Sequence, residues 1–131
     1  MNAALDILVI EDARADIGLI ERCVRQSFPA ARCHRVASPP EVDEALAHGK
    51  WHLVLSDYAI PALALDDVLA RCRARHPDTP FLLVSDSVDG EQTVDLLKRG
   101  VWDLVFKDNL ARLAPAAKRA LQDAAERRAR R

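Results

Sequence analysis

Short apolar runs alternate with amphipathic stretches along the chain, and this alternation is its clearest structural signal. Four runs are rich in Leu, Val and Ile and lack strict polar–apolar alternation, which is typical of strands buried on both faces of a parallel sheet. A weaker fifth run lies between the first two amphipathic stretches. The predicted strands are residues 5–10, 32–37, 53–56, 81–84 and 101–106.

The stretches between these runs place apolar residues at the three- and four-residue spacing of helices. Ser38 precedes two prolines, which indicates a helix start, because a serine hydroxyl caps the first turn and proline is tolerated there. Asp89 opens a sequence that resembles a capping box, and Gly100 fits the position just after that helix. The predicted helices are residues 13–27, 38–49, 63–75, 89–100 and a long C-terminal one at about 109–130.

Five strand–helix units in this order predict an α/β fold. Right-handed crossovers would place helices on both faces of one doubly wound, five-stranded parallel sheet, a (βα)5 arrangement. No linker, repeat or low-complexity stretch interrupts the pattern, so we expect a single domain over residues 1–131 without an effector domain. Ligands of such sheets bind outside the carboxyl ends of the strands.

Composition narrows the class of protein. The formal net charge is −1, so the chain as a whole has no field that would attract nucleic acid or an acidic membrane. Its three cysteines form no CxxC pair, and no signal peptide or membrane-spanning apolar run is present, so we expect a cytoplasmic protein. The four glycines form neither a GxGxxG motif nor a P-loop, which disfavours a nucleotide or flavin site.

Acidic residues follow two of the predicted strands. Glu11 and Asp12 come directly after the first strand, and Asp57 comes after the third. Three hard carboxylates at one sheet edge suit Mg²⁺, and an aspartate just past a buried strand can form an aspartyl phosphate. Taken alone, Asp12 is better explained as a helix N-cap, and Asp57 could be a turn residue.

A hydroxyl and an ammonium complete the set. Ser85 follows the fourth strand and Lys107 the fifth, so both would lie at the same edge and could bind phosphoryl oxygens. Each also has a simpler interpretation, since a serine at a strand end often bonds to backbone and a lysine is usually a surface residue. The five positions together are far more specific than any one of them.

In these features the chain resembles the receiver domain of bacterial two-component response regulators, from residue 5 to about residue 121. The resemblance implies the flavodoxin-like receiver fold, with strand order 2-1-3-4-5. It rests on the acid pair Glu11-Asp12, on Asp57 with Pro61 four residues later, on Ser85 after its apolar run, and on Lys107 seven residues after Gly100.

The resemblance also implies roles for the residues of the edge. Asp57 would be the phosphoacceptor in a reaction that the domain itself catalyses, and Asp12 and Asp57 would ligate Mg²⁺ directly. Glu11 would act largely through water, and the backbone carbonyl of Ala59 would be a further metal ligand. The phosphoryl oxygens would be bound by Ser85 and Lys107.

Partners follow from the same resemblance. The Lys-Asp-Asn-Leu segment at residues 107–110 is similar to that of a subgroup found beside PAS and histidine-kinase modules. The resemblance therefore implies a histidine kinase as phosphodonor, of a type that can contain PAS modules. Output would pass to a downstream protein target, and the last strand and helix could form a homodimer. Neither nucleic acid nor membrane is expected as a partner.

Two positions depart from the family pattern. Leu104 stands where an aromatic residue is usual, which puts the coupling of a moving hydroxyl to a rotating ring in doubt, and Asp86 follows Ser85 where a small residue is commoner. Asp86 could repel a phosphodonor or point to solvent. Trp102 and Leu104 could form an output patch or be buried under the last helix. Because of Leu104 and Asp86, the alternative function is a receiver-like interaction module that is rarely or never phosphorylated.

Overall fold

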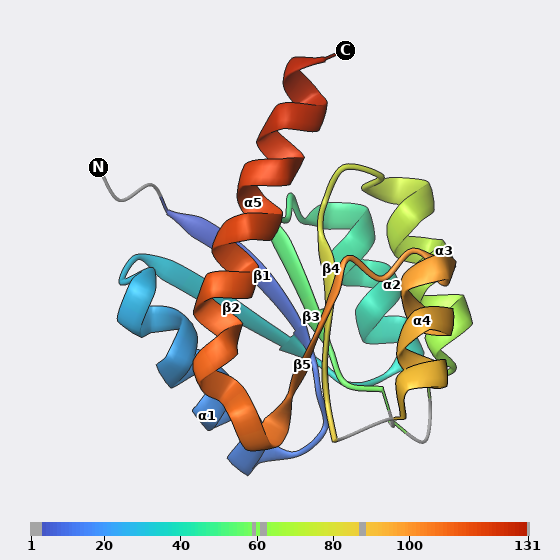
Figure 1. The fold of residues 1–131 in the computed structure, drawn as a ribbon. Helices are drawn as coiled ribbons and strands as arrows, with labels where there is room; N and C mark the ends of the chain where they lie inside the picture. The colour runs from blue at the N-terminus through green and yellow to red at the C-terminus, as the bar shows by residue number, and fades with distance from the viewer. Residues whose placement is uncertain (1–3, 59, 61–62, 87–88, 131) are drawn as a thin grey trace.

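The computed structural model describes residues 4–58, 60, 63–86 and 89–130, and in them strands and helices alternate along the chain (Figure 1). A 3-10 helix, η1 (Lys107–Arg112), precedes the last α-helix. The elements are β1 (Leu5–Ile10), α1 (Arg14–Ser27), β2 (Ala31–Val36), α2 (Pro39–His48), β3 (Leu53–Ser56), α3 (Leu65–Arg75), β4 (Phe81–Ser85), α4 (Gly90–Arg99), β5 (Asp103–Phe106) and α5 (Leu113–Ala129).

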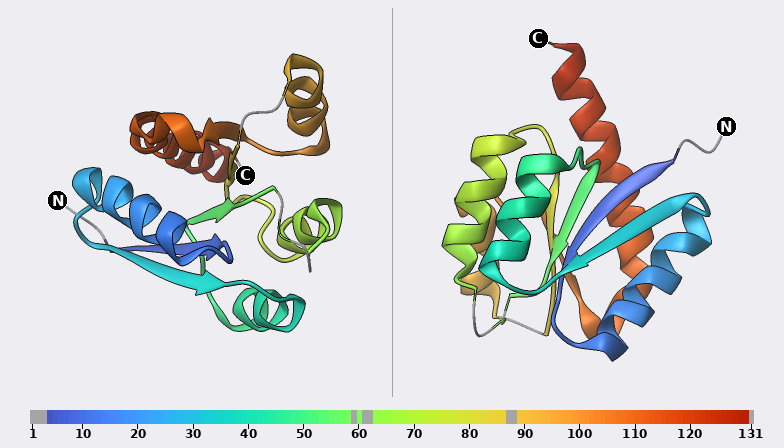
Figure 2. Two further views of the ribbon diagram at one scale, coloured as in Figure 1. Left: turned by 90° about the horizontal axis from the view of Figure 1, so that it is seen from below. Right: turned by 180° about the vertical axis from the view of Figure 1, so that it is seen from behind.

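The five strands form one parallel sheet in the order β2-β1-β3-β4-β5, which confirms the predicted fold class and strand order. Helices α1 and α5 cover one face, and α2, α3 and α4 cover the other (Figure 2). The last residue of β1, Ile10, pairs with Val36 at the end of β2 and with Ser56 at the end of β3. These three strands therefore end level with one another.

Successive residues of the central strands point into two separate cores. On β1, Leu8 and Ile10 pack into the core beneath α2, α3 and α4, whereas Ile7 and Val9 pack into the core beneath α1 and α5. All four of these side chains are buried. Burial on both faces explains why the strand sequences lack polar–apolar alternation.

Helix ends form largely where the local sequence predicts them. The Ser38 hydroxyl accepts a hydrogen bond from the Glu41 amide, and the Asp89 carboxylate accepts one from the Gln92 amide at 2.7 Å. Gly100 ends α4 with a φ of 115°, a left-handed conformation that favours glycine. These caps confirm the predicted starts of α2 and α4 and the predicted end of α4.

The last helix differs from the prediction. A single helix was expected from about residue 109, but the α-helix begins at Leu113, and Asn109 within the preceding η1 has the non-helical angles φ −139° and ψ 55°. Pro115 gives the physical reason, because a proline lacks the amide needed in a helix interior but fits the first turn. Starting the helix at Leu113 places Pro115 in that first turn.

Candidate functional site

The carboxyl edge of the sheet brings together the three acids singled out from the sequence. One carboxylate oxygen each from Glu11, Asp12 and Asp57 lies within 4.8 Å of the other two. Backbone hydrogen bonds extend the sheet ladder past the strand ends, from the Glu11 amide to the Val36 carbonyl at 3.1 Å and from the Asp57 amide to the Ile10 carbonyl at 2.9 Å. The sheet itself therefore positions the backbone that carries these acids.

Glu11 has a structural role as well as a place in the acidic cluster. Its side chain is only 1% exposed, and its Oε1 accepts hydrogen bonds of 3.1 Å from the Asp12 and Ala13 amides. Ala13 is the N-cap residue of α1 and makes no side-chain cap bond. The interpretation of Asp12 as the helix cap is therefore wrong, because Glu11 binds the amides at this helix start and Asp12 is exposed.

Lys107 is surrounded by carboxylates. Its Nζ lies 3.0 Å from Glu11 Oε2, 3.1 Å from Asp57 Oδ2 and 2.7 Å from Asp16 Oδ2. Only 16% of its side chain is exposed, so it is not the ordinary surface lysine that its residue type alone would indicate. Burial would lower the pKa of Lys107, but the contacts with the Asp16, Glu11 and Asp57 carboxylates outweigh it and hold that pKa above the ordinary value of 10.5.

The pKa of Glu11 shifts upward from its ordinary value. Desolvation by burial is the main cause, and the charge of Asp57 adds to it, while the Ala13 amide and Lys107 act in the opposite direction. A buried carboxylate that is costly to ionise is stabilised by any cation placed against it. In this structure that cation is the Lys107 ammonium.

Asp16 is a residue of this site that sequence reasoning missed. It lies in the first turn of α1 and makes the shortest of the three contacts to Lys107. An acid in the first turn of a helix is common, because it interacts favourably with the helix dipole. Because such an acid is ordinary, Asp16 was not singled out from the sequence. Its place one helical turn beyond Asp12 was nevertheless a signal that could have identified it.

The donor set of the edge fits Mg²⁺. Three carboxylates supply the hard oxygen ligands that this ion prefers. Glu11 Oε2 is buried and has no hydrogen-bond partner among the described residues; its 3.0 Å contact with Lys107 is an ion pair outside hydrogen-bond geometry. An oxygen buried in this state can accept a metal without giving up a hydrogen bond. The further ligand expected at Ala59 lies outside the described residues.

The remaining predicted positions occupy different surroundings. Ser85 ends β4, is 4% exposed and pairs in register with Phe106, the residue before Lys107. Asp86 is exposed and does not belong to the acidic cluster. Leu104 is buried in the core beneath α2, α3 and α4, whereas Trp102 is half-buried. The Lys107–Asp108 peptide bond is trans.

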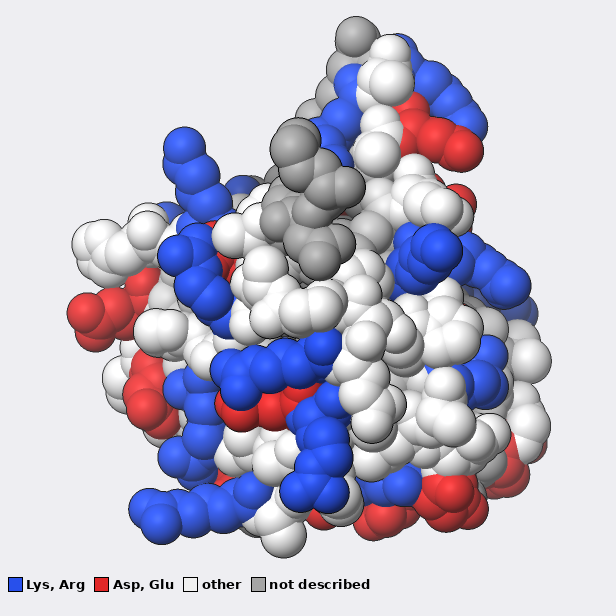
Figure 3. Space-filling view, turned by 90° about the vertical axis from the view of Figure 1, so that its left-hand side faces the viewer, with Lys and Arg blue, Asp and Glu red and all other residues white. Residues whose placement is uncertain are grey.

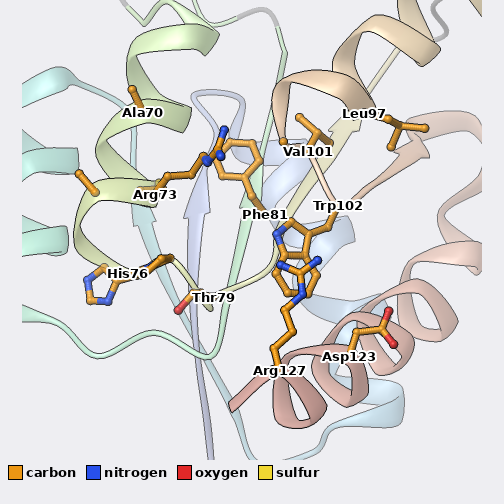
Figure 4. Close-up of a pocket in the computed structure, with 14 residues that line it drawn as sticks. Ala70, Arg73, His76, Thr79, Phe81, Leu97, Val101, Trp102, Asp123 and Arg127 are labelled. Carbon is orange, nitrogen blue, oxygen red and sulfur yellow. The ribbon is translucent and has the colours of Figure 1, made fainter. Parts of the chain in front are cut away.

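A cavity of about 950 Å³ lies at the opposite edge of the sheet, where β4 and β5 begin (Figure 4). It is bordered by the end of α3, the segment before β5 and the last turns of α5. The Arg127 guanidinium lies 4.1 Å from the centre of the Trp102 ring, a cation–π contact. The hollow and the acidic cluster are thus at different ends of the molecule.

Side chains of both charge signs lie on the surface of the molecule. On the face that carries α1 and β2, basic side chains gather at several places beside acidic ones (Figure 3). One such pair joins Arg32 to Asp6 at 2.9 Å. Among the described residues, none of the helices combines the length and the hydropathy that a membrane-spanning segment requires.

Comparison with known proteins agrees with this architecture. A family model described as the response regulator receiver domain matches residues 7–118. The nitrogen assimilation regulatory protein NtrX of Azorhizobium caulinodans is 29% identical over 125 residues, which cover 91% of this chain but only 26% of NtrX. The chain thus spans about a quarter of the length of that relative.

Solved structures share the fold. A CheY-like response regulator receiver domain from Methanospirillum hungatei superposes with a TM-score of 0.81 at 18% identity, covering 95% of this chain and 99% of that one. NtrX from Brucella abortus superposes with a TM-score of 0.84 at 24% identity, covering 96% of this chain and 28% of that one.

Proposed function

The chain belongs to the response regulator receiver domain family, and from this premise we propose that it accepts a phosphoryl group on Asp57 from a histidine kinase, in a reaction that needs Mg²⁺. The observation that carries the proposal is the carboxyl edge itself. There the Asp57 carboxylate lies beside two other carboxylates and 3.1 Å from a partly buried ammonium.

The proposed step is an attack by a carboxylate oxygen of Asp57 on the phosphorus of a phosphohistidine. The P–O bond forms as the P–N bond breaks, and the electron pair returns to the imidazole nitrogen, which takes up a proton. When bound by Glu11, Asp12 and Asp57, Mg²⁺ supplies positive charge that offsets the carboxylates and the phosphoryl oxygens.

Two other side chains of this edge would receive the phosphoryl group. The Lys107 ammonium already lies against Asp57 and is charged at neutral pH, so it can pair with a phosphoryl oxygen as soon as one is present. The Ser85 hydroxyl, at the end of the neighbouring strand, can donate a hydrogen bond to another. The Ser85 contact would favour the phosphorylated state of Asp57, whereas the Lys107 ammonium pairs with Asp57 in both states.

Intact-mass measurement after incubation with Mg²⁺ and a small phosphodonor tests the proposal. The wild type should gain about 80 Da, the mass of one HPO₃, and Asp57→Asn should gain nothing. Asp86→Asn is the matched control, because it removes an exposed acid beside Ser85 but leaves the cluster intact. A gain that persists in Asp57→Asn would rule out Asp57 as the acceptor.

A receiver-like interaction module that is rarely or never phosphorylated is the second candidate. Leu104 favours it, because a buried aliphatic side chain cannot report a phosphoryl group through the rotation of a ring. The same assay separates the two candidates. Absence of any mass gain, with both small donors and a cognate kinase, would favour the interaction module.

A further inference from the structure

The Lys107 ammonium binds carboxylates of two different kinds. Glu11 and Asp57 belong to the acidic cluster that fits a divalent cation, whereas Asp16 does not. Asp16 nevertheless makes the closest contact with the ammonium, at 2.7 Å, and its own side chain is 33% exposed. Among the described residues, Asp16 is therefore the one ion-pair partner of Lys107 that a metal in the cluster would leave in place.

A metal and the ammonium would compete for the same two carboxylates. Glu11 Oε2 and Asp57 Oδ2 lie 3.0 and 3.1 Å from Lys107 Nζ, so a divalent cation bound by these carboxylates would lie close to a positive charge. Like charges at such distances in a partly buried site repel strongly. Metal binding therefore requires the ammonium to withdraw from the cluster or to have its charge balanced by another group.

We propose that Asp16 is the positioning residue that balances the Lys107 ammonium when Mg²⁺ binds. Asp16 would keep the ammonium paired outside the cluster, which reduces its competition with the metal while holding it within reach of Asp57. The inference rests on the metal site of the proposed function, but it does not require that Asp57 be phosphorylated.

The local structure explains why Asp16 can take this role. The Asp12 and Ala13 amides at the start of α1 are bound by Glu11 Oε1, which ties the beginning of this helix to the cluster. Helix α1 also packs against η1, whose first residue is Lys107. A residue in the first turn of α1 is thereby brought from 91 positions away in the sequence to the Lys107 ammonium.

The test is a titration of the full chain with MgCl₂, followed by calorimetry and by the backbone NMR signals of residues 10–13. Asp16→Asn should weaken Mg²⁺ binding by about three- to tenfold, because the ammonium then pairs only with carboxylates of the cluster and competes more strongly with the metal. Asp16→Glu should restore much of the affinity. Glu21→Gln removes the same charge from the same helix, away from Lys107, and should change the affinity less than about twofold.

A double-mutant cycle identifies the route of the effect. In a Lys107→Met background there is no ammonium to balance, so adding Asp16→Asn should change Mg²⁺ affinity by less than about twofold. An equal loss in both backgrounds would overturn the proposal, because Asp16 would then act on the metal directly. An unchanged affinity in Asp16→Asn alone would also overturn it.

Two further measurements distinguish a failure of this proposal from the unfolding of a variant and from a failure of the proposed function. Urea unfolding of Asp16→Asn and Glu21→Gln checks that both variants are folded at the titration temperature. Phosphorylation of Asp57 is read separately by mass, so a protein that binds Mg²⁺ as expected but gains no phosphoryl group would refute the proposed function and leave this inference standing. A wild type that binds no Mg²⁺ would overturn both.

Discussion

The two edges of the sheet hold their charged groups in different ways. At the carboxyl edge, Glu11 is buried and Lys107 is partly buried, and each is stabilised by the other's charge. At the opposite edge, where the strands begin and which we call the amino edge, Arg127 is exposed and lies over the half-buried ring of Trp102. The charge balance at the carboxyl edge depends on every charged residue of that site. The contact between Arg127 and Trp102 depends instead on the packing of the arginine side chain against the ring.

This difference has consequences for how each edge responds to its surroundings. A partly buried ion pair leaves an uncompensated charge when one partner is lost, and a bound metal can replace that partner. A guanidinium that stays in water loses only a modest attraction when it leaves an aromatic ring. The carboxyl edge should therefore be sensitive to metal and pH, and the amino edge to neither.

The largest expected effect is at the amino edge. Trp102→Ala should lower the free energy of unfolding by about 2–3 kcal/mol, because the ring packs against the cores on both faces of the sheet. Urea unfolding with and without Mg²⁺ should give the same loss. A loss that disappears in Mg²⁺ would show that the two edges are coupled.

Lys107→Met should have a somewhat smaller effect that depends on metal. Without Mg²⁺ we expect a loss of about 2 kcal/mol in unfolding free energy, because Glu11 and Asp57 are left without their cation. Saturating Mg²⁺ should recover much of that loss by binding the same carboxylates. Equal losses in both conditions would contradict the comparison of the edges.

The contribution of Lys107 should also depend on pH. The pKa of Lys107 is raised above its ordinary value of 10.5, so its stabilising effect is complete below pH 10.5 and is lost as pH rises through the folded-state pKa. The difference in unfolding free energy between wild type and Lys107→Met should stay constant from pH 7 to about 10 and shrink above it. The same comparison with Trp102→Ala should show no such decline.

The smallest expected effect is that of Arg127→Met. Loss of the cation–π contact should lower the free energy of unfolding by about 0.5 kcal/mol, because the guanidinium is exposed. Mg²⁺ affinity, measured by calorimetry, should not change. A change in Mg²⁺ affinity would mean that α5 transmits the state of one edge to the other.

Much of the fold follows from local sequence signals. The two-faced burial of the strands, the caps at Ser38 and Asp89 and the left-handed Gly100 are each determined by short-range chemistry, and the structure confirms them. The convergence of Glu11, Asp12 and Asp57 follows from the parallel order of the strands, because their carboxyl ends share one edge.

The features that sequence reasoning missed depend on how the elements pack. Whether Asp16 reaches Lys107 is decided by the rotation of α1 against η1, and each residue along a helix turns the side-chain direction by roughly 100°. For Leu104 the sequence left open a surface patch or burial under the last helix, and packing instead buries it on the other face, beneath α2, α3 and α4. The delayed start of α5, by contrast, had a local cause that was overlooked, the proline at position 115.

Helix α5 runs from the carboxyl edge, where it follows η1, to the amino edge, where Arg127 meets Trp102 (Figure 1). The face that it buries consists mostly of alanine. An alanine side chain has no rotamers to lose, so fixing this helix on the sheet costs backbone entropy but almost no side-chain entropy. Helix α5, which connects the two edges, therefore loses little side-chain conformational freedom when it packs on the sheet. The buried residues of this helix are Leu113, Ala116, Ala117, Ala120 and Ala124.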